Sequence, residues 1–386
     1  MSVVFILQAM NNKYHMIVIG AGSGGLSMAL GLHQLGMKVL LIDKSDQSIG
    51  GECLNTGCIP SKALVHASKL IHSARKARQF GLEVNGRPSM DKVWQYVKST
   101  QSKIRAHENA SFFRQQGLDV ELGRARFTGK QEVEVNGKIY FGKKITIATG
   151  SKSAKLQVPG IDLIKYYDNE SIWDLAEIPK TILFVGAGPI NMELGQAYAR
   201  LGSQVLIVEM GDRILTKEPP EISEILFQQS VEMGITFYLN SKVERFTDAH
   251  TAILKQQRQQ QQQRQQQQQQ QRQQQQHTIR FDTVVVGIGR KLNFTELNPQ
   301  SAGIKLDKSG ALQLDPYLRT TNKNVLAIGD AANGPQFSHA AELQATVLIA
   351  NLISPLKKKV NYHKLSWVTF TDPEVATFGW NEQQLK

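Results

Sequence analysis

The sequence has little cysteine and no long apolar run. Its 386 residues include only two cysteines, Cys53 and Cys58, which excludes a secreted scaffold held by several disulfides. No apolar segment reaches the roughly 20 residues that a membrane-spanning helix needs. The apolar start, residues 2–7, has neither a basic flank nor a small-residue cleavage site. We therefore expect a soluble cytoplasmic protein that does not interact with membranes.

Acidic residues are fewer than basic ones. The chain has 45 Lys and Arg against 33 Asp and Glu, a formal net charge of +12, which would allow binding to nucleic acid or acidic surfaces. The basic residues are scattered, however, so solvated surface is the simpler interpretation and we expect no nucleic-acid partner. With 41% hydrophobic residues, a chain of this length can form two or three globular domains.

One segment near the start has the pattern of a nucleotide-binding βαβ unit. An apolar strand at 15–19 is followed by Gly20, Gly22 and Gly25, a helical stretch, and a second strand that ends at Asp43. Such glycines let the backbone approach a pyrophosphate, the helix N-terminus offers N–H groups, and the acid can accept ribose hydroxyls. The alternative is that the glycines serve only a tight turn.

The same plan returns later in the chain. A strand at 181–185 precedes Gly186 and Gly188, a helix follows, and the next strand ends at Glu209. Two such units imply two dinucleotide-binding domains in one chain.

Three further strand-to-glycine segments complete this organisation. They lie at 144–150, 282–289 and 324–330. We expect the first two to close one domain each and the third to return the chain to the first domain.

Residues 256–276 are only glutamine and three arginines. The tract has no apolar side chains to bury, so we expect a disordered insertion in a surface connection. Glutamine tracts can also self-associate as β-structure, which keeps a role as an interaction module open. An expansion without function is the simpler interpretation.

The cysteine pair requires an irregular backbone. In a regular helix a spacing of five residues puts two side chains about 140° apart and beyond disulfide reach. Gly57 and Pro60 could produce a bend at a helix start, where the helix N-terminus and Lys62 would favour the thiolate. The alternatives are two buried cysteines without a redox role, or half of a metal site. Because Cys53 and Cys58 lack two further clustered ligands, we expect no metal site.

Residues 50–62, Gly-Gly-Glu-Cys-Leu-Asn-Thr-Gly-Cys-Ile-Pro-Ser-Lys, resemble the redox motif of the class I pyridine nucleotide-disulfide oxidoreductases. That family includes glutathione reductase, dihydrolipoyl dehydrogenase and mercuric reductase. The resemblance runs from about Tyr14 to the end, apart from the glutamine tract. It implies an oxidoreductase with FAD and NAD(P)H as cofactors and a redox-active disulfide, acting in cell redox homeostasis.

The resemblance also implies a role for individual residues. Cys58 would contact the flavin and Cys53 would exchange with substrate, while Lys62 would lie beside flavin N5, paired with Glu193. Asp330 matches the acid that holds the FAD ribityl chain, although an ordinary turn aspartate is the alternative. The positions implied to bind cofactor are Gly20, Gly22, Gly25, Asp43, Lys44, Gly51, Lys62, Thr149, Gly150, Gly186, Gly188, Glu209, Gly289, Gly329 and Asp330.

The fold implied is α/β, with two three-layer Rossmann-like domains and a truncated α+β dimerisation domain. We expect the FAD-binding domain at 14–154 and 291–358, the NAD(P)-binding domain at 155–290, and the start of the dimerisation domain at 359–386. Relatives form homodimers, so we expect the dimer contacts of this chain to be incomplete.

Charge favours NADH over NADPH. A 2′-phosphate would be repelled by Glu209, and residues 210–216 carry one basic residue, Arg213, where NADPH-binding relatives have two. Arg213 keeps NADPH open as an alternative. Pro189 stands where relatives often have a tyrosine that covers the flavin, so the nicotinamide pocket would lack the shielding of that ring.

Residues that identify the substrate in members of this family are missing from the sequence. The histidine-acid pair of thiol-disulfide members and the C-terminal cysteine pair of mercuric reductases are both missing, and His339 and His363 fit structural or solvent-facing roles. The segments at 196–204 and 335–337 resemble the mercuric-reductase branch most, without its N-terminal metal-binding domain. A disulfide, a dithiol or Hg(II) is expected as substrate. The alternative is a flavoprotein that binds nucleotides without efficient turnover.

Overall fold

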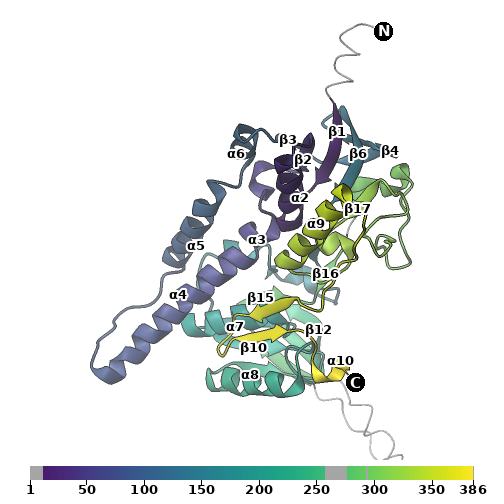
Figure 1. Cartoon of the computed structure of the whole chain (residues 1–386). Coiled ribbons are helices and arrows are strands. Elements are labelled where there is room, and N and C mark those ends of the chain that lie inside the picture. Colours follow the sequence, from purple (N-terminus) through teal and green to yellow (C-terminus); the bar gives the residue numbers. More distant parts are fainter. Residues whose placement is uncertain (1–11, 257–275, 293, 386) are drawn as a thin grey trace, which may run out of the picture. The chain divides into compact units, whose positions relative to one another are not determined.

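The computed structural model describes residues 12–256, 276–292 and 294–385. In it the chain forms two compact units, each assembled from separate stretches of sequence (Figure 1). The first unit holds residues 12–55, 101–152 and 290–365, and the second holds 56–100, 153–289 and 366–385. Of the glutamine tract 256–276, which we expected to be disordered, residues 257–275 lie outside the described residues, whereas Gln256 ends one strand and Gln276 begins the next.

Residues 56–100, expected in the first domain, group with the second unit. Compact units follow packing density, whereas a nucleotide-binding domain is defined by the ligand that it holds. The expected domain boundaries therefore stay a prediction.

The first unit is built on a seven-stranded sheet. Its elements are β1 (Lys13–Ile19), α2 (Ser23–Gln34), β2 (Val39–Asp43), α3 (Gly51–Asn55), α6 (Ala110–Gln115), β3 (Asp119–Leu122), β4 (Arg126–Gly129), β5 (Glu132–Val135), β6 (Lys138–Ile147), β17 (Val325–Ala327) and α9 (Ser338–Ile353). The strand order is β3-β2-β1-β6-β5-β4, with β17 paired to β6. β1, β2, β3, β6 and β17 are parallel, and β4 and β5 extend the sheet as an antiparallel hairpin.

Strand β1 is buried on both faces, as its continuous apolar sequence predicts. Met16 and Val18 pack with residues of α2 and α9, whereas Ile17 and Ile19 pack with β4, β5 and residues 294–304. Helices α2 and α9 lie side by side (Figure 1), and a Cβ at Gly24 would come within 3.0 Å of Ala341 Cβ. Small residues thus let these two helices pack closely.

The second unit contains a parallel five-stranded sheet in the order β11-β10-β9-β15-β8 and an antiparallel sheet β12-β13-β14. Its elements are α4 (Cys58–Lys76), α5 (Met90–Arg105, which continues into the first unit), β8 (Tyr166–Tyr167), β9 (Thr181–Val185), α7 (Pro189–Leu201), β10 (Gln204–Val208), α8 (Pro220–Glu232), β11 (Thr236–Tyr238), β12 (Ser241–Asp248), β13 (Thr251–Gln256), β14 (Gln276–Arg280), β15 (Thr283–Val286), β18 (Ser366–Thr369), β19 (Val375–Phe378) and α10 (Glu382–Leu385). Two short strands, β7 (Lys152–Ser153) and β16 (Arg290–Lys291), lie where the chain passes between the units.

Strand β9 divides its side chains between two layers. Ile182 and Phe184 pack with α4 and α7, and Leu183 and Val185 pack against the sheet β12-β13-β14. The sheet therefore has helices on one face and a second sheet on the other.

The α/β fold with two Rossmann-like units is confirmed. Both strand–glycine–helix–strand units form parallel pairs, with Ile19 beside Ile42 and Val185 beside Val208. The return segment also behaves as expected, because β17 pairs with β6 of the first sheet. None of the described helices is long and apolar enough to cross a membrane.

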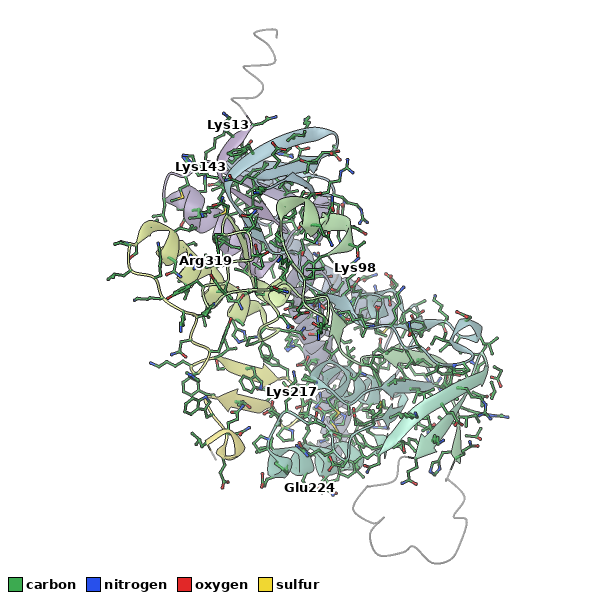
Figure 2. The ribbon with its side chains drawn as sticks, turned by 90° about the vertical axis from the view of Figure 1, so that its right-hand side faces the viewer. Lys13, Lys98, Lys143, Lys217, Glu224 and Arg319 are labelled. Atoms are coloured by element: carbon green, nitrogen blue, oxygen red, sulfur yellow. The ribbon has the colours of Figure 1, made fainter. Side chains whose placement is uncertain are left out.

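Basic side chains are spread over both units. In Figure 2, Lys13 and Lys143 project from β1 and β6 of the first unit, and Lys98 projects from α5 in the second.

Removal of the hydroxyl group should affect stability differently at two buried tyrosines. Tyr198 is fully buried, and its hydroxyl has no hydrogen-bond partner among the described residues. Tyr140 donates to Glu121 Oε2 at 2.7 Å. Tyr198→Phe should leave the melting temperature unchanged or raise it, whereas Tyr140→Phe should lower stability by about 1 kcal/mol. Thermal unfolding of the two variants measures this; a marked loss for Tyr198→Phe would contradict it.

Candidate functional site

The first glycine-rich loop shapes an anion-binding helix start at the carboxyl end of β1. Gly20 has φ +106°, and Gly22 is the N-cap of α2 without a side-chain cap. A Cβ at Gly25 would lie 1.8 Å from Gly20 O, so only glycine allows the helix to approach the loop this closely. The first-turn N–H groups of α2 therefore have no side-chain acceptor and can bind an anion.

Asp43 holds the glycine-rich loop from the neighbouring strand. Its Oδ2 accepts from Ala21 N–H at 2.6 Å, and its Oδ1 accepts from Lys44 N–H at 2.7 Å and from the Ser48 hydroxyl. Since a carboxylate has about four acceptor positions, one on Oδ2 remains for a ligand hydroxyl. The Lys44 side chain is exposed.

The start of the cysteine motif packs on the same loop. Gly51 has φ +60°, and a Cβ there would come within 2.6 Å of Gly22 Cα. Gly50 N–H donates to Ala21 O at 2.9 Å. Helix α3 begins here, so Cys53 lies on a helix that starts beside the glycine-rich loop.

Asp330 belongs to a polar network that the sequence did not reveal. Its Oδ2 lies 3.2 Å from Arg290 Nε and accepts from the Ser151 hydroxyl. Arg290 also donates to Ser151 Oγ at 2.6 Å and forms an ion pair with Glu52. Two local signals could have pointed to this network. Arg290 directly follows Gly289, and Glu52 directly precedes Cys53.

Several expected cofactor positions meet at one edge of the first sheet. Gly20 follows β1, Asp43 ends β2, Thr149 and Gly150 follow β6, and Gly329 follows β17. Ligands of open α/β sheets bind at the carboxyl ends of the strands. The structure thus brings the expected residues of the first unit to the edge where a nucleotide would bind.

The second unit repeats this arrangement. Gly186 has φ +98°, and Gly188 is the N-cap of α7 without a side-chain cap. Glu209 accepts from Ala187 N–H and Gly211 N–H, both at 2.7 Å. Gly289 follows β15 at φ +109°.

In the second unit, Asn191 occupies the position that Gly25 has in the first. Its amide donates to Val185 O at 3.0 Å and to Gly186 O at 2.8 Å. A Cβ at Gly287 would lie 2.5 Å from Asn191 Oδ1, so Gly287 makes room for this side chain. The loop is therefore held by a side-chain amide here rather than by close helix packing.

The backbone between the two cysteines is irregular, as the spacing predicted. Helix α3 ends at Asn55, and Cys58 is the first residue of α4, with Gly57 as its N-cap at φ −119° and ψ −111°. Pro60 lies in the first turn of α4. The two cysteines thus belong to different helices, and Cys58 is at a helix N-terminus.

Lys62 and Glu193 form the ion pair that the resemblance implied. Lys62 Nζ lies 2.8 Å from Glu193 Oε2 and 3.0 Å from Oε1. The Glu193 side chain is 6% exposed and that of Lys62 is 35% exposed. Phe370, which the sequence did not single out, donates its N–H to Glu193 Oε1 at 2.8 Å and places its ring 4.7 Å from Lys62 Nζ.

His339 and His363 are both exposed, in agreement with the solvent-facing role expected for them. The His339 ring stacks on Phe337.

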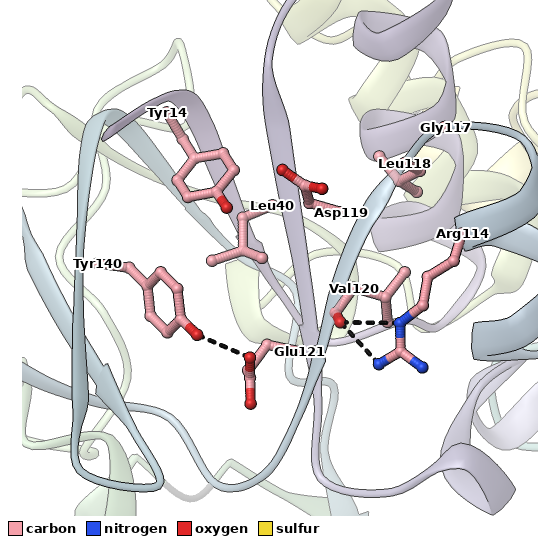
Figure 3. Close-up of a pocket in the computed structure, with 9 residues that line it drawn as sticks. All are labelled: Tyr14, Leu40, Arg114, Gly117, Leu118, Asp119, Val120, Glu121 and Tyr140. Atoms are coloured by element: carbon pink, nitrogen blue, oxygen red, sulfur yellow. Dashed lines mark hydrogen bonds between the residues drawn. The ribbon is translucent and has the colours of Figure 1, made fainter. Parts of the chain in front are cut away.

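A pocket at the opposite edge of the first sheet is lined by the amino ends of its parallel strands (Figure 3). Tyr140 donates to Glu121, and Arg114 donates to Val120 O at 2.8 Å. Burial, together with the neighbouring acid Asp119, raises the pKa of Tyr14 well above its usual range. These acids already interact with the tyrosines, so nothing in this pocket points to a ligand.

Comparisons with known proteins agree with the geometry. A family model described as pyridine nucleotide-disulphide oxidoreductase matches residues 14–345. The mercuric reductase of Bacillus cereus is 30% identical over 383 residues, covering 97% of this chain and 57% of that protein. Dihydrolipoyl dehydrogenase 3 of Pseudomonas putida is 32% identical over 384 residues, covering 97% of this chain and 78% of that protein. The chain thus spans little more than half of the mercuric reductase.

A solved structure has the same fold. The HOCl-induced flavoprotein disulfide reductase RclA from Escherichia coli matches with a TM-score of 0.80 at 25% identity, covering 96% of this chain and 79% of that chain.

Gly25 of the first loop and Gly188 of the second should differ in how well they tolerate replacement by alanine. Gly25→Ala places a methyl group against Gly20 O and should lower stability by about 3 kcal/mol or more. Gly188→Ala meets no atom within 4 Å, so its melting temperature should match wild type while a nucleotide is excluded from the helix start. Thermal unfolding and nucleotide titration test both variants. Equal stability of Gly25→Ala and wild type would refute the close approach.

Proposed function

Because the chain belongs to the pyridine nucleotide-disulphide oxidoreductase family, we propose that it transfers electrons from NADH through bound FAD to a Cys53–Cys58 disulfide. The observation that carries this proposal is the ion pair between the buried carboxylate of Glu193 and Lys62, a lysine on the helix that begins with Cys58. A disulfide or a metal ion would be the final electron acceptor, whereas a dithiol substrate would be oxidised in the reverse direction, with NAD⁺ as the acceptor.

The residues of the first unit fit FAD. A Cβ at Gly22 would meet only Gly51 Cα, at 3.7 Å, so the start of α2 has room for a pyrophosphate to approach the backbone. Asp43 has acceptor capacity left for a ribose hydroxyl. Asp330 is oriented by Ser151 and Arg290, which fits a role in holding the ribityl chain. We therefore assign FAD binding to the edge of the first sheet where its parallel strands have their carboxyl ends.

When bound, FAD supplies two-electron chemistry, taking hydride from NADH and passing electrons to a disulfide. Cys58 would be the thiol facing the flavin, since a helix N-terminus stabilises the thiolate that forms. Cys53 would exchange with substrate as the second thiol. Glu193 would keep the Lys62 ammonium in place, because a buried carboxylate requires a countercharge.

The second unit fits NADH better than NADPH. The Glu209 carboxylate keeps acceptor capacity for ribose hydroxyls and would repel a 2′-phosphate. Arg213, the one basic residue of the segment 210–216, forms an ion pair with Asp212 at 3.5 Å and donates to Thr216 O at 3.1 Å. A phosphate would have to compete with both contacts of this arginine.

Flavin reduction should therefore prefer NADH, with kcat/KM at least about tenfold higher than for NADPH, the ratio that 1.4 kcal/mol gives. Glu209→Gln should narrow this preference because it removes the negative charge. Glu224→Gln, an exposed acid on α8 in the same unit, is the matched control and should leave the ratio unchanged. Equal use of both nucleotides by the wild-type protein at low salt would overturn the assignment.

The two cysteines should be distinguishable in serine variants. After reduction, Cys53→Ser should keep the long-wavelength absorbance of a thiolate beside oxidised flavin, because Cys58 remains. Cys58→Ser should lose it. Both variants should bind FAD like the wild type, and anaerobic absorbance spectroscopy measures all three proteins. Persistence of the absorbance in Cys58→Ser would show that the flavin-facing thiol is assigned to the wrong residue.

We also propose a substrate class. Relatives named mercuric reductase and dihydrolipoyl dehydrogenase both match along 97% of the chain, and thiol exchange at Cys53 could serve a disulfide, a dithiol or a thiophilic metal ion. Turnover assays discriminate among them: disulfides and metal ions are tested as acceptors with NADH as the donor, and dithiols are tested as donors to the oxidised protein with NAD⁺ as the acceptor. Flavin reduction without turnover of any of them would favour the nucleotide-binding alternative.

A further inference from the structure

Phe370 contacts both members of the Lys62–Glu193 pair. Its backbone N–H donates to the Glu193 oxygen Oε1 at 2.8 Å, and its ring centroid lies 4.7 Å from Lys62 Nζ. A ring face at this distance attracts a cation and covers one side of it. The position of Phe370 therefore affects both the carboxylate of Glu193 and the ammonium of Lys62.

Three side chains of α7 fix the segment that carries Phe370. Glu193, Gln196 and Arg200 are spaced by three and four residues, which places them on one face of the helix. Gln196 accepts from Asp372 N–H at 2.7 Å and donates to Asp372 O at 3.2 Å. Arg200 Nη2 pairs with Asp372 Oδ2 at 2.7 Å. Residues 370–372 are thus bound to this face of α7 at three successive points.

We call Glu193, Gln196 and Arg200 the clamp on α7. Stability alone does not explain why polar residues occupy these buried positions. The side chain of Arg200 is 2% exposed, and its Nε has no hydrogen-bond partner among the described residues. Gln196 is fully buried. Burying such groups is often no better for stability than apolar packing, and an unsatisfied donor has a cost. Their effect is instead to fix the position of the 370–372 backbone.

We propose that Phe370 is a positioning residue for the Lys62–Glu193 pair, and that the clamp on α7 holds it over the ammonium. The ring limits access of solvent and solutes to Lys62 on the side that it covers. The N–H of Phe370 orients the Glu193 carboxylate toward Lys62. The consequence for flavin reduction rests on the function proposed above, whereas the shielding of Lys62 depends only on the geometry.

Acylation of lysines tests the shielding without any cofactor. Lys69 lies on the same helix, its side chain is also 35% exposed, and it pairs with an exposed acid, Glu374. With a small acylating reagent such as an activated acetyl ester, Phe370→Leu should raise the acylation rate of Lys62 about 3- to 30-fold. Lys69 serves as the internal reference. Quantitative mass spectrometry of the peptides measures both rates in one sample.

Three further variants keep the test decisive. Phe378→Leu removes an exposed ring, 71% accessible, from β19 of the same hairpin and should change neither rate. Arg200→Gln leaves Phe370 itself intact but releases Asp372, and should also raise the rate at Lys62. Phe370→Tyr retains the ring and should match wild type. An unchanged Lys62-to-Lys69 ratio in both Phe370→Leu and Arg200→Gln would overturn the proposal.

A second measurement separates this proposal from the proposed function. In the FAD-loaded protein, Phe370→Leu should slow flavin reduction by NADH about 3- to 30-fold, while FAD content and melting temperature stay close to those of Phe378→Leu. Absence of reduction in the wild-type protein would contradict the proposed function and leave the acylation result as the test of the positioning role. Normal reduction in Phe370→Leu would contradict an effect of Phe370 on the flavin site.

Discussion

The ion pair between Lys62 and Glu193 is the constraint on which the candidate site depends. Glu193 is buried, so its carboxylate requires the ammonium of Lys62 at 2.8 Å. The pair joins α4 to α7, and Lys62 follows Cys58 by four residues, so both side chains lie on one face of α4. Fixing Lys62 against α7 thereby fixes the first turn of α4 and the cysteine at its N-terminus.

The same device for holding a glycine-rich loop is used in both units. An acid at the end of the second strand accepts a hydrogen bond from a backbone N–H of the loop. Asp43 accepts from Ala21 N–H at 2.6 Å, and Glu209 accepts from Ala187 N–H at 2.7 Å. The units differ in how the helix meets the loop, since one has Gly25 and the other has Asn191. Each acid is a structural acceptor for its loop and, in the proposed function, would also accept hydrogen bonds from a ribose.

The sequence predicted what depends on neighbours along the chain. Both βαβ units, the irregular backbone between Cys53 and Cys58, and the return strand follow from local patterns of glycine and apolar residues. The Lys62–Glu193 pair spans 131 residues, and only a family resemblance pointed to it. No local pattern could have revealed the Phe370 contact with Glu193, 177 residues away. Local patterns mark Arg290 and Glu52 as neighbours of motif residues, but not their contact with each other across 238 residues.

These missed residues share a physical feature. Each acts through a backbone group or a charge brought close by tertiary packing, so its role depends on the fold rather than on a motif. The sequence therefore predicted which residues would meet the cofactors, and the structure added the residues that hold those side chains in place.

The central claim is that a cysteine pair exchanges electrons with a bound flavin. Anaerobic titration of the FAD-loaded protein with NADH tests it most directly, because the disulfide adds a second two-electron acceptor to the flavin. The account predicts that the wild-type protein takes up twice as many electrons as its bound flavin alone can hold, and that Cys58→Ser takes up only the flavin's share. Uptake limited to the flavin in the wild-type protein, with both thiols initially oxidised, would contradict the account.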